Sequence, residues 1–167
     1  MIDILRSMGA VIEERPHRTG PDEGVGESMA DLRVRSSDLQ AIDLGPADVA
    51  GAIDEIPVIC LAATAARGRT VIRGAGELRH KESDRITGVA AGLRALGARV
   101  EIDGDDLHIE GGTALRGAVT DSLDDHRLAM TFAIAGLVAS GTTTIERPGS
   151  ATISYPGFFD DLERVRA

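Results

Sequence analysis

The chain has 167 residues, of which 43% are hydrophobic, so it is long enough to form one domain with a buried core. Only 2% of its residues are aromatic and its net charge is −9, which disfavours nucleic acids and anionic membranes as partners. The single cysteine, Cys60, excludes an intramolecular disulfide, and no stretch approaches the roughly 18 apolar residues of a membrane span. Because residues 1–10 show no secretion signal, we expect a soluble, cytoplasmic protein.

Hydrophobic spacing and turn residues predict two helices and several short strands before residue 77. The nearly apolar segment 58–66 is expected to be a buried helix, with Pro57 in its first turn and Cys60 as a small buried hydrophobe. In chain order, the predicted elements are a helix over 1–8, a strand opening at 11–12, a polar loop over 15–29, strands over 32–35 and 40–44, a helix over 58–66 and a strand over 69–73.

The second half of the chain repeats this pattern. The sequence LRSMGA at 5–10 matches LRALGA at 93–98, and GRTVI at 68–72 matches GTTTI at 141–145. The strand LRVR at 32–35 has its counterpart in LHIE at 107–110. The unit of helix, strand, strand, helix and strand therefore occurs twice, and we expect an α/β (α+β) domain built from repeated units.

The most charged stretch, ELRHKESDRI at 77–86, stands at the start of a predicted helix. We expect this helix to begin near Ser83, with Ser83 or Glu82 capping its first N–H groups. A charged first turn is typical of a solvated surface. Such a turn can also hold an anion, because the helix dipole favours negative charge at this end. Lys81, the only lysine among seventeen arginines, lies in this stretch.

The repeat predicts that three helix N-termini converge. Asp54 and Arg127 are 73 positions apart and each precedes a buried helix, while Glu82 precedes a third. Taken alone, Asp54 is typical of an N-cap, and the acidic run 121–125 lacks the spacing of metal ligands, so no metal is expected. If the helices pack side by side, one face forms an anion site with two carboxylates and carries Asp54, Lys81, Glu82, Arg85, His126 and Arg127.

Three motifs resemble those of the 3-phosphoshikimate 1-carboxyvinyltransferase family, the EPSP synthases. Residues 78–86 match its LRxKESDRI signature, 125–130 (DHRLAM) its DHRxAM motif, and 153–159 (ISYPGFF) its closing S-F/Y-P segment. The resemblance runs from about Met8 to the C-terminus. It implies one domain of the two-domain enolpyruvyl transferase fold, an inside-out α/β barrel. Residues 1–167 are then expected to be the C-terminal domain, without the N-terminal one.

The resemblance implies transfer of the enolpyruvyl group of phosphoenolpyruvate to the 5-hydroxyl of shikimate 3-phosphate, without a cofactor. Asp54 and Glu82 then correspond to the proton-transfer groups, and Lys81 to the lysine near the hydroxyl and bridging oxygens. Arg85 and Arg127 correspond to the arginines that hold the carboxylate and phosphate of phosphoenolpyruvate. His126 is either catalytic or a supporting group.

Two other functions stay open at this point. A UDP-N-acetylglucosamine enolpyruvyl transferase is disfavoured by the KESDR and DHR motifs. A non-catalytic anion-binding module, left by truncation, is separated from an enzyme by whether a partner half exists. The family's N-terminal residues that contact shikimate 3-phosphate have no counterpart here, and Ile153 stands where some members carry a lysine. We therefore expect a chain that folds but turns over slowly or not at all without its missing N-terminal domain.

Overall fold

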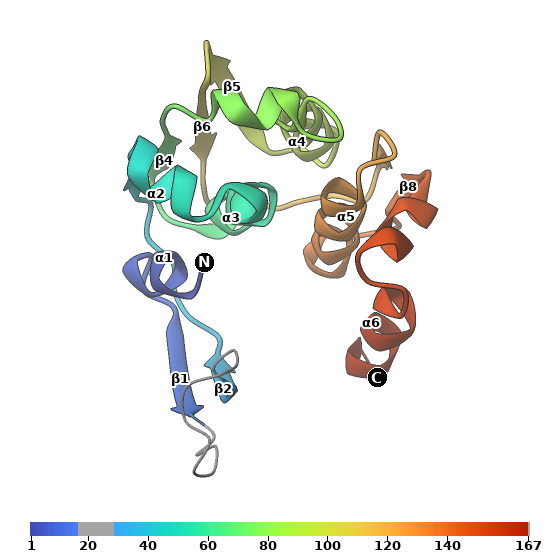
Figure 1. The fold of residues 1–167 in the computed structure, drawn as a ribbon, viewed down its shortest axis with the longest axis horizontal. Coiled ribbons are helices and arrows are strands. Elements are labelled where there is room, and N and C mark those ends of the chain that lie inside the picture. Colours follow the sequence, from blue (N-terminus) through green and yellow to red (C-terminus); the bar gives the residue numbers. More distant parts are fainter. Residues whose placement is uncertain (17–28, 167) are drawn as a thin grey trace, which may run out of the picture.

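The computed structural model describes residues 1–16 and 29–166, so most of the predicted loop over 15–29 lies outside the described residues (Figure 1). The helices are α1 (Ile2–Ser7), α2 (Pro46–Gly51), α3 (Ile56–Ala65), α4 (Arg85–Ala95), α5 (His126–Val138) and α6 (Phe158–Arg166). The strands are β1 (Val11–Pro16), β2 (Ala30–Arg35), β3 (Asp43–Leu44), β4 (Arg69–Ile72), β5 (Arg99–Asp103), β6 (Asp106–Glu110), β7 (Val119–Asp121) and β8 (Thr144–Glu146). Short 3-10 helices are η1 (Ile53–Glu55), η2 (Gly76–His80) and η3 (Pro148–Ile153).

Two copies of one unit follow each other along the chain. Each copy has a helix, an antiparallel hairpin, and two parallel strands on either side of a buried helix. The first copy is α1, β1–β2, β3, α3 and β4, and the second is α4, β5–β6, β7, α5 and β8. Gly9 and Gly97, which follow the first helix of each copy, share a φ of +94°, a conformation that glycine adopts without strain. The predicted repeat and the mixed helix and strand fold are confirmed.

One sheet joins the two copies. Its strand order is β3-β4-β6-β5, and β4 meets β6 antiparallel with Arg69 opposite Glu110 and Ile72 opposite Leu107. Within the described residues, the β1–β2 and β7–β8 sheets contain two strands each. The β1–β2 hairpin projects from the body, and β8 lies at the opposite side (Figure 1).

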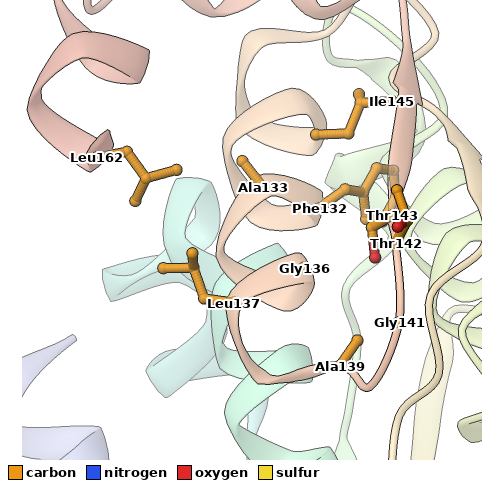
Figure 2. Close-up of a pocket in the computed structure, with 10 residues that line it drawn as sticks. All are labelled: Phe132, Ala133, Gly136, Leu137, Ala139, Gly141, Thr142, Thr143, Ile145 and Leu162. Atoms are coloured by element: carbon orange, nitrogen blue, oxygen red, sulfur yellow. The ribbon is translucent and has the colours of Figure 1, made fainter. Parts of the chain in front are cut away.

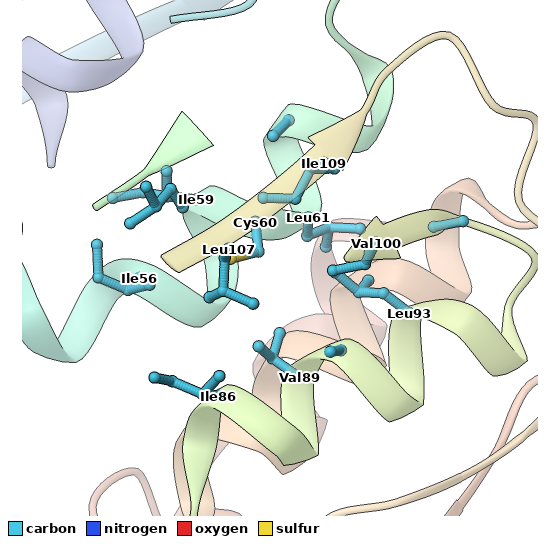
Figure 3. Packing of buried hydrophobic residues seen from close by; sticks show 14 of the residues in the cluster. Ile56, Ile59, Cys60, Leu61, Ile86, Val89, Leu93, Val100, Leu107 and Ile109 are labelled. Carbon is cyan, nitrogen blue, oxygen red and sulfur yellow. The ribbon is translucent and has the colours of Figure 1, made fainter. Parts of the chain in front are cut away.

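The core lies between α3, α4 and the four-stranded sheet (Figure 3). Ile59 of α3, Leu93 of α4 and Leu107 of β6 are each 0% exposed, and full burial of such a side chain contributes about 1.5–3 kcal/mol. Cys60 is also fully buried, as predicted, and this burial raises the pKa of its thiol to about 12. No helix in the described ranges is long and apolar enough to cross a membrane.

Some element boundaries differ from those predicted. α4 begins at Arg85 rather than near Ser83, because the Asp84 side chain accepts the N–H of Thr87 at 3.0 Å and caps the helix. The strand expected over 40–44 is only Asp43–Leu44. Three elements, α2, β7 and α6, were not predicted. β7 has only three residues, too few for a periodic pattern.

Candidate active site

Three helix N-termini meet where the two copies join. α3 follows the short turn η1, α4 starts at Arg85 and α5 starts at His126. Each of these three helices packs against the other two. The first N–H groups of a helix have no partner within it, so polar side chains are expected to gather there. The structure brings side chains from all three starts into contact.

Arg85 lies at the centre of this cluster, with 1% of its side chain exposed. Its Nε donates to Oδ2 of Asp125 at 2.7 Å, its Nη1 to Oδ1 of Asp54 at 2.8 Å, and its Nη2 to Oε2 of Glu82. Burial acts to lower the pKa of Arg85, but hydrogen bonds and charges from these carboxylates outweigh it and raise the pKa. The guanidinium therefore stays charged, and it fixes three carboxylates from three helix starts.

The two carboxylates predicted to transfer protons lie next to each other. Asp54 and Glu82 bind the two terminal nitrogens of Arg85, and their side chains are 40% and 51% exposed. Asp54 does not act as an N-cap, since neither η1 nor α3 has a side-chain cap hydrogen bond. Partial burial acts to raise the pKa of Asp54, but the hydrogen bond from Arg85 and the charges of Arg127 and Lys81 lower it overall. Asp54 is therefore ionised at neutral pH.

Lys81 and Arg127 are held more loosely than Arg85. The Nζ of Lys81 is 3.4 Å from Oε1 of Glu77 and 3.7 Å from Oδ1 of Asp54. Nη1 of Arg127 donates to Oε1 of Glu55 at 3.3 Å, and within residues 1–16 and 29–166 its buried Nε has no hydrogen-bond partner. A hollow of about 250 Å³ lies beside Asp54 and Arg127. These two cations are the ones most available to an anionic ligand.

Asp125 has a role that the sequence reasoning missed. Its side chain is 0% exposed and accepts hydrogen bonds from Nε of Arg85, from Oγ of Ser83 at 3.0 Å and from the backbone N–H of Arg127 at 2.8 Å. It therefore caps α5 and ties the start of α4 to it. Burial acts to raise the pKa of Asp125, but Arg85 and the N–H of Arg127 lower it overall. The sequence did contain a signal for the capping role of Asp125, because an aspartate directly before an apolar helix is typical of an N-cap.

The other acidic residues of this run turn toward a different partner. Asp121 and Asp124 both accept hydrogen bonds from Arg147, Asp124 at 2.7 Å from its Nη1. No group of three or more potential metal ligands occurs in the part of the chain that the structure describes. His126 is half-buried, and its side chain has no hydrogen bond or ion pair to any described residue, so the structure does not tie it to Arg85.

Arg79 holds the charged segment before α4 from the side opposite Arg85. Nη1 of Arg79 donates to Oδ2 of Asp84 at 3.0 Å, and its Nε donates to Oδ1 of Asp105 at 2.9 Å. Asp105 lies in the β5–β6 turn. Arg79 thus anchors the segment before α4 to the hairpin and leaves Lys81 and Glu82 to face Asp54 and Arg85.

A larger hollow, of about 590 Å³, lies away from the charged cluster (Figure 2). Residues of α5, α6 and the segment leading into β8 line it, and most of them are apolar. None of the predicted site residues is among them. The candidate site is therefore the charged cluster around Arg85, where the ionisable side chains converge, and not the larger hollow.

Comparison with known proteins agrees with the three motifs. The family model for EPSP synthase (3-phosphoshikimate 1-carboxyvinyltransferase) matches residues 1–162. The chain is 53% identical over 164 residues to the 3-phosphoshikimate 1-carboxyvinyltransferase of Roseiflexus sp. (strain RS-1), and 51% identical over 166 residues to that of Gloeobacter violaceus. These matches cover 98% and 99% of this chain but only 37% and 38% of the relatives.

A solved structure gives the same result. The EPSP synthase of Acinetobacter baumannii superposes with a TM-score of 0.88 at 37% identity, over 98% of this chain and 38% of that one. The enolpyruvyl transferase NikO of Streptomyces tendae, at 22% identity and a TM-score of 0.68, shares the fold. The chain thus spans somewhat more than a third of the length of the relatives it matches, and it belongs to the EPSP synthase family.

Proposed function

We propose that this chain supplies one part of a site that transfers the enolpyruvyl group of phosphoenolpyruvate to the 5-hydroxyl of shikimate 3-phosphate, with release of phosphate. The observation that supports this most strongly is that Asp54 and Glu82 share the guanidinium of Arg85, beside Lys81 and Arg127. Addition followed by elimination needs two proton-transfer groups, and phosphoenolpyruvate needs cations for its carboxylate and phosphate. The cluster contains both kinds of group.

The family resemblance suggests a role for each side chain, and the positions of the side chains are compatible with these roles. Ionised Asp54 accepts the proton of the attacking hydroxyl while the new C–O bond forms at C2 of phosphoenolpyruvate. Once Glu82 has left Arg85 and taken up a proton from solvent, it gives that proton to the methylene carbon, which becomes a methyl group in the tetrahedral intermediate. In the second step the C2–O bond to phosphate breaks, Glu82 takes back a methyl proton to restore the double bond, and the proton held by Asp54 passes to the departing phosphate. Lys81, close to Asp54, balances charge at the hydroxyl oxygen.

Binding must rearrange the ion pairs. Arg85 is almost wholly buried, so an anionic ligand reaches it only after a carboxylate moves away. Glu82 is half exposed, and its departure leaves the buried pair of Arg85 and Asp125 intact. Arg127 and Lys81 make the longer contacts, so they meet the ligand first. This order lets phosphoenolpyruvate itself free Glu82 for proton transfer.

We further propose that residues 1–167 are the C-terminal domain and that an N-terminal domain completes the site. The relatives are longer than this chain by more than half of their own length, which leaves room for a second domain that contacts shikimate 3-phosphate. Water is excluded from such a site only when both parts close on the substrates. The isolated chain should therefore turn over slowly or not at all.

The test is phosphate release from phosphoenolpyruvate plus shikimate 3-phosphate. The chain is assayed alone and with the N-terminal part of the Roseiflexus relative, whose competence is first shown with its own C-terminal part. We expect activity only in the mixture, loss of activity in Glu82→Gln, and full activity in Glu146→Gln, an exposed carboxylate on β8. A folded chain that binds phosphoenolpyruvate but stays inactive in a competent mixture would instead indicate a binding module.

A further inference from the structure

Lys81 and Glu82 lie in a short connecting segment. Residues 81–84 join η2 to α4 and belong to no helix or strand. The end of this segment is well fixed, because Arg85 is held by three carboxylates. Side chains of a reactive site keep their geometry only when the residues around them are held in turn. The placement of Lys81 and Glu82 therefore also depends on what holds the other end, at η2.

The first part of η2 is docked on the β5–β6 turn. The backbone N–H of Ala75 donates to the carbonyl oxygen of Asp105 at 3.0 Å, and the N–H of Gly74 donates to Oδ1 of Asp106 at 2.8 Å. Leu78, in the middle of η2, is 0% exposed and belongs to the core. These contacts hold residues 74–78, and the chain then continues into the charged segment.

Arg79 connects this turn to both sides of the charged segment. Its Nε donates to Oδ1 of Asp105 at 2.9 Å, and its Nη2 donates to the carbonyl oxygen of Gly104. Its Nη1 donates to Oδ2 of Asp84 at 3.0 Å, so it reaches the residue that caps α4. The guanidinium is planar, and partners on all three of its nitrogens fix its direction. Arg79 thus spans residues 81–84 from one end to the other.

Asp105 can approach η2 closely because residue 76 is glycine. A Cβ atom on Gly76 would lie 2.6 Å from Oδ2 and 2.9 Å from Cγ of Asp105, which is too close, but 3.5 Å from its Cβ, which is an ordinary contact. Gly76 is not among the glycines with a positive φ, so its backbone conformation does not require glycine. The close approach of the Asp105 carboxylate is what a larger residue at position 76 would prevent.

We propose that Asp105 is a positioning residue for the enolpyruvyl transfer, an inference that rests on the function proposed above. Its carboxylate acts through Arg79, which holds the charged segment so that Lys81 stays beside Asp54 and Glu82 beside Arg85. The side chains of Arg79 and Asp105 are 30% and 56% exposed, so their pairing adds little to stability. The effect of Asp105 on the reaction can therefore be measured in a folded protein.

The kinetic test uses the chain completed with the N-terminal part of the Roseiflexus relative. In Asp105→Ala we expect kcat for phosphate release to fall about tenfold, because small displacements of reacting groups are costly. The KM for phosphoenolpyruvate should change less than about threefold, since Arg127 is held on α5 and not by this turn. The urea midpoint should stay close to that of the unmodified chain.

Asp103→Ala is the matched control. It removes a carboxylate from the same hairpin, and the side chain of Asp103 has no hydrogen bond or ion pair to any residue in the described ranges. Its kcat should equal that of the unmodified chain. Full kcat in Asp105→Ala, or an equal loss in Asp103→Ala, would overturn the proposal.

Gly76→Ala reaches the same contact from the other side. The added methyl group should displace the Asp105 carboxylate from Arg79 and lower kcat about as much as Asp105→Ala does. The double variant should be no slower than Asp105→Ala alone, because both changes break one contact. Losses that multiply, to about a hundredfold in the double variant, would show that the two residues act separately and would contradict the proposal.

The only lysine of the chain provides a readout that needs no activity. Reductive methylation with isotope-labelled formaldehyde labels Lys81 and the N-terminal amine, so one side-chain methyl resonance reports the surroundings of Lys81. We expect Asp105→Ala to shift this resonance in the folded chain and Asp103→Ala to leave it in place. An unshifted resonance in Asp105→Ala would mean that the turn does not position Lys81.

The two measurements separate this inference from the function on which it rests. If Asp54→Asn abolishes phosphate release while Asp105→Ala changes neither kcat nor the Lys81 resonance, the transfer stands and the positioning role is wrong. If the unmodified completed enzyme releases no phosphate, the proposed transfer is wrong, and with it the role of Asp105 in catalysis. A shifted resonance would then support only the coupling of Asp105 to Lys81.

Discussion

Arg85 and Arg147 each bind more than one carboxylate, yet their surroundings differ. Arg85 has 1% of its side chain exposed and holds Asp54, Glu82 and the fully buried Asp125, whereas Arg147 is 43% exposed and holds Asp121 and Asp124 near the surface. Water screens all the pairs of the second cluster, whereas the pair of Arg85 and Asp125 in the first is buried and shielded from it. We therefore expect the same pairing chemistry to stabilise the fold where the helices meet and to contribute little at the surface.

Loss of the central arginine should have the largest effect. Arg85→Met leaves Asp125 buried without a cation, and removal of one partner of a buried pair costs about 3–5 kcal/mol of the free energy of unfolding. Arg147→Met, the matched change in the exposed cluster, should leave urea denaturation almost unaltered. Equal loss of stability in the two variants would show that burial does not distinguish the Arg85 cluster from the Arg147 cluster.

Neutralising Asp125 should have a smaller effect. Asp125→Asn can still cap α5, but it loses the charge on its hydrogen bond with Arg85, which we expect to cost about 2 kcal/mol at pH 7. Asp121→Asn is the matched control in the exposed cluster, and its urea midpoint should stay close to that of the unmodified chain.

The pH dependence sharpens this prediction. The folded-state pKa of Asp125 lies below its ordinary value of 3.8, so the stability that its charge contributes is complete above that pH. It is lost as the pH falls through the folded-state pKa. The stability difference between the unmodified chain and Asp125→Asn should therefore shrink in acid below about pH 3.8. If the difference stays constant below that pH, the charge of the Asp125 carboxylate is not what stabilises the contact between the starts of α4 and α5.

The affinity for phosphoenolpyruvate should depend on the cluster around Arg85 and not on the exposed cluster around Arg147. Arg127→Met removes a half-buried cation beside Asp54, and we expect phosphoenolpyruvate to bind the completed enzyme about tenfold more weakly, since a charged hydrogen bond contributes about 1.5–3 kcal/mol. Stability should change little. Arg147→Met should leave the dissociation constant measured by calorimetry as it was, and weakening in this control would point to a general effect of lost positive charge.

The smallest change is expected at the cap of α4. Asp84→Ala removes the side chain that accepts the N–H of Thr87 and pairs with Arg79, and loss of an N-cap costs about 1 kcal/mol. The midpoint of thermal unfolding should fall modestly. An unchanged midpoint would show that Arg79 and the β5–β6 turn hold the helix start without the cap.

Much of this arrangement could be predicted from the sequence. The repeat is visible because Gly9 and Gly97 end equivalent helices, and it correctly placed Asp54 near Arg127 at converging helix starts. The burial of Arg85 could not be predicted, because it depends on Asp125 approaching from α5 across the joint between the copies. A charged residue in a first turn looks the same in sequence whether it faces water or a buried carboxylate.

Element boundaries show a similar limit. Ser83, Glu82 and Asp84 are all plausible caps in sequence, and the choice of Asp84 is decided by its pairing with Arg79, which in turn binds Asp105 in a distant turn. The roles of Lys81, His126 and the individual carboxylates in the reaction stay predictions.

The most direct test is the turnover of Asp54→Asn in the chain completed with an N-terminal part. If Asp54 accepts the hydroxyl proton beside Arg85, kcat for phosphate release should fall by roughly 100-fold or more, the usual contribution of general base catalysis, while Asp121→Asn in the exposed cluster keeps full activity. If a folded Asp54→Asn enzyme releases phosphate at the same rate as the unmodified one, the cluster around Arg85 is not the site of this chemistry.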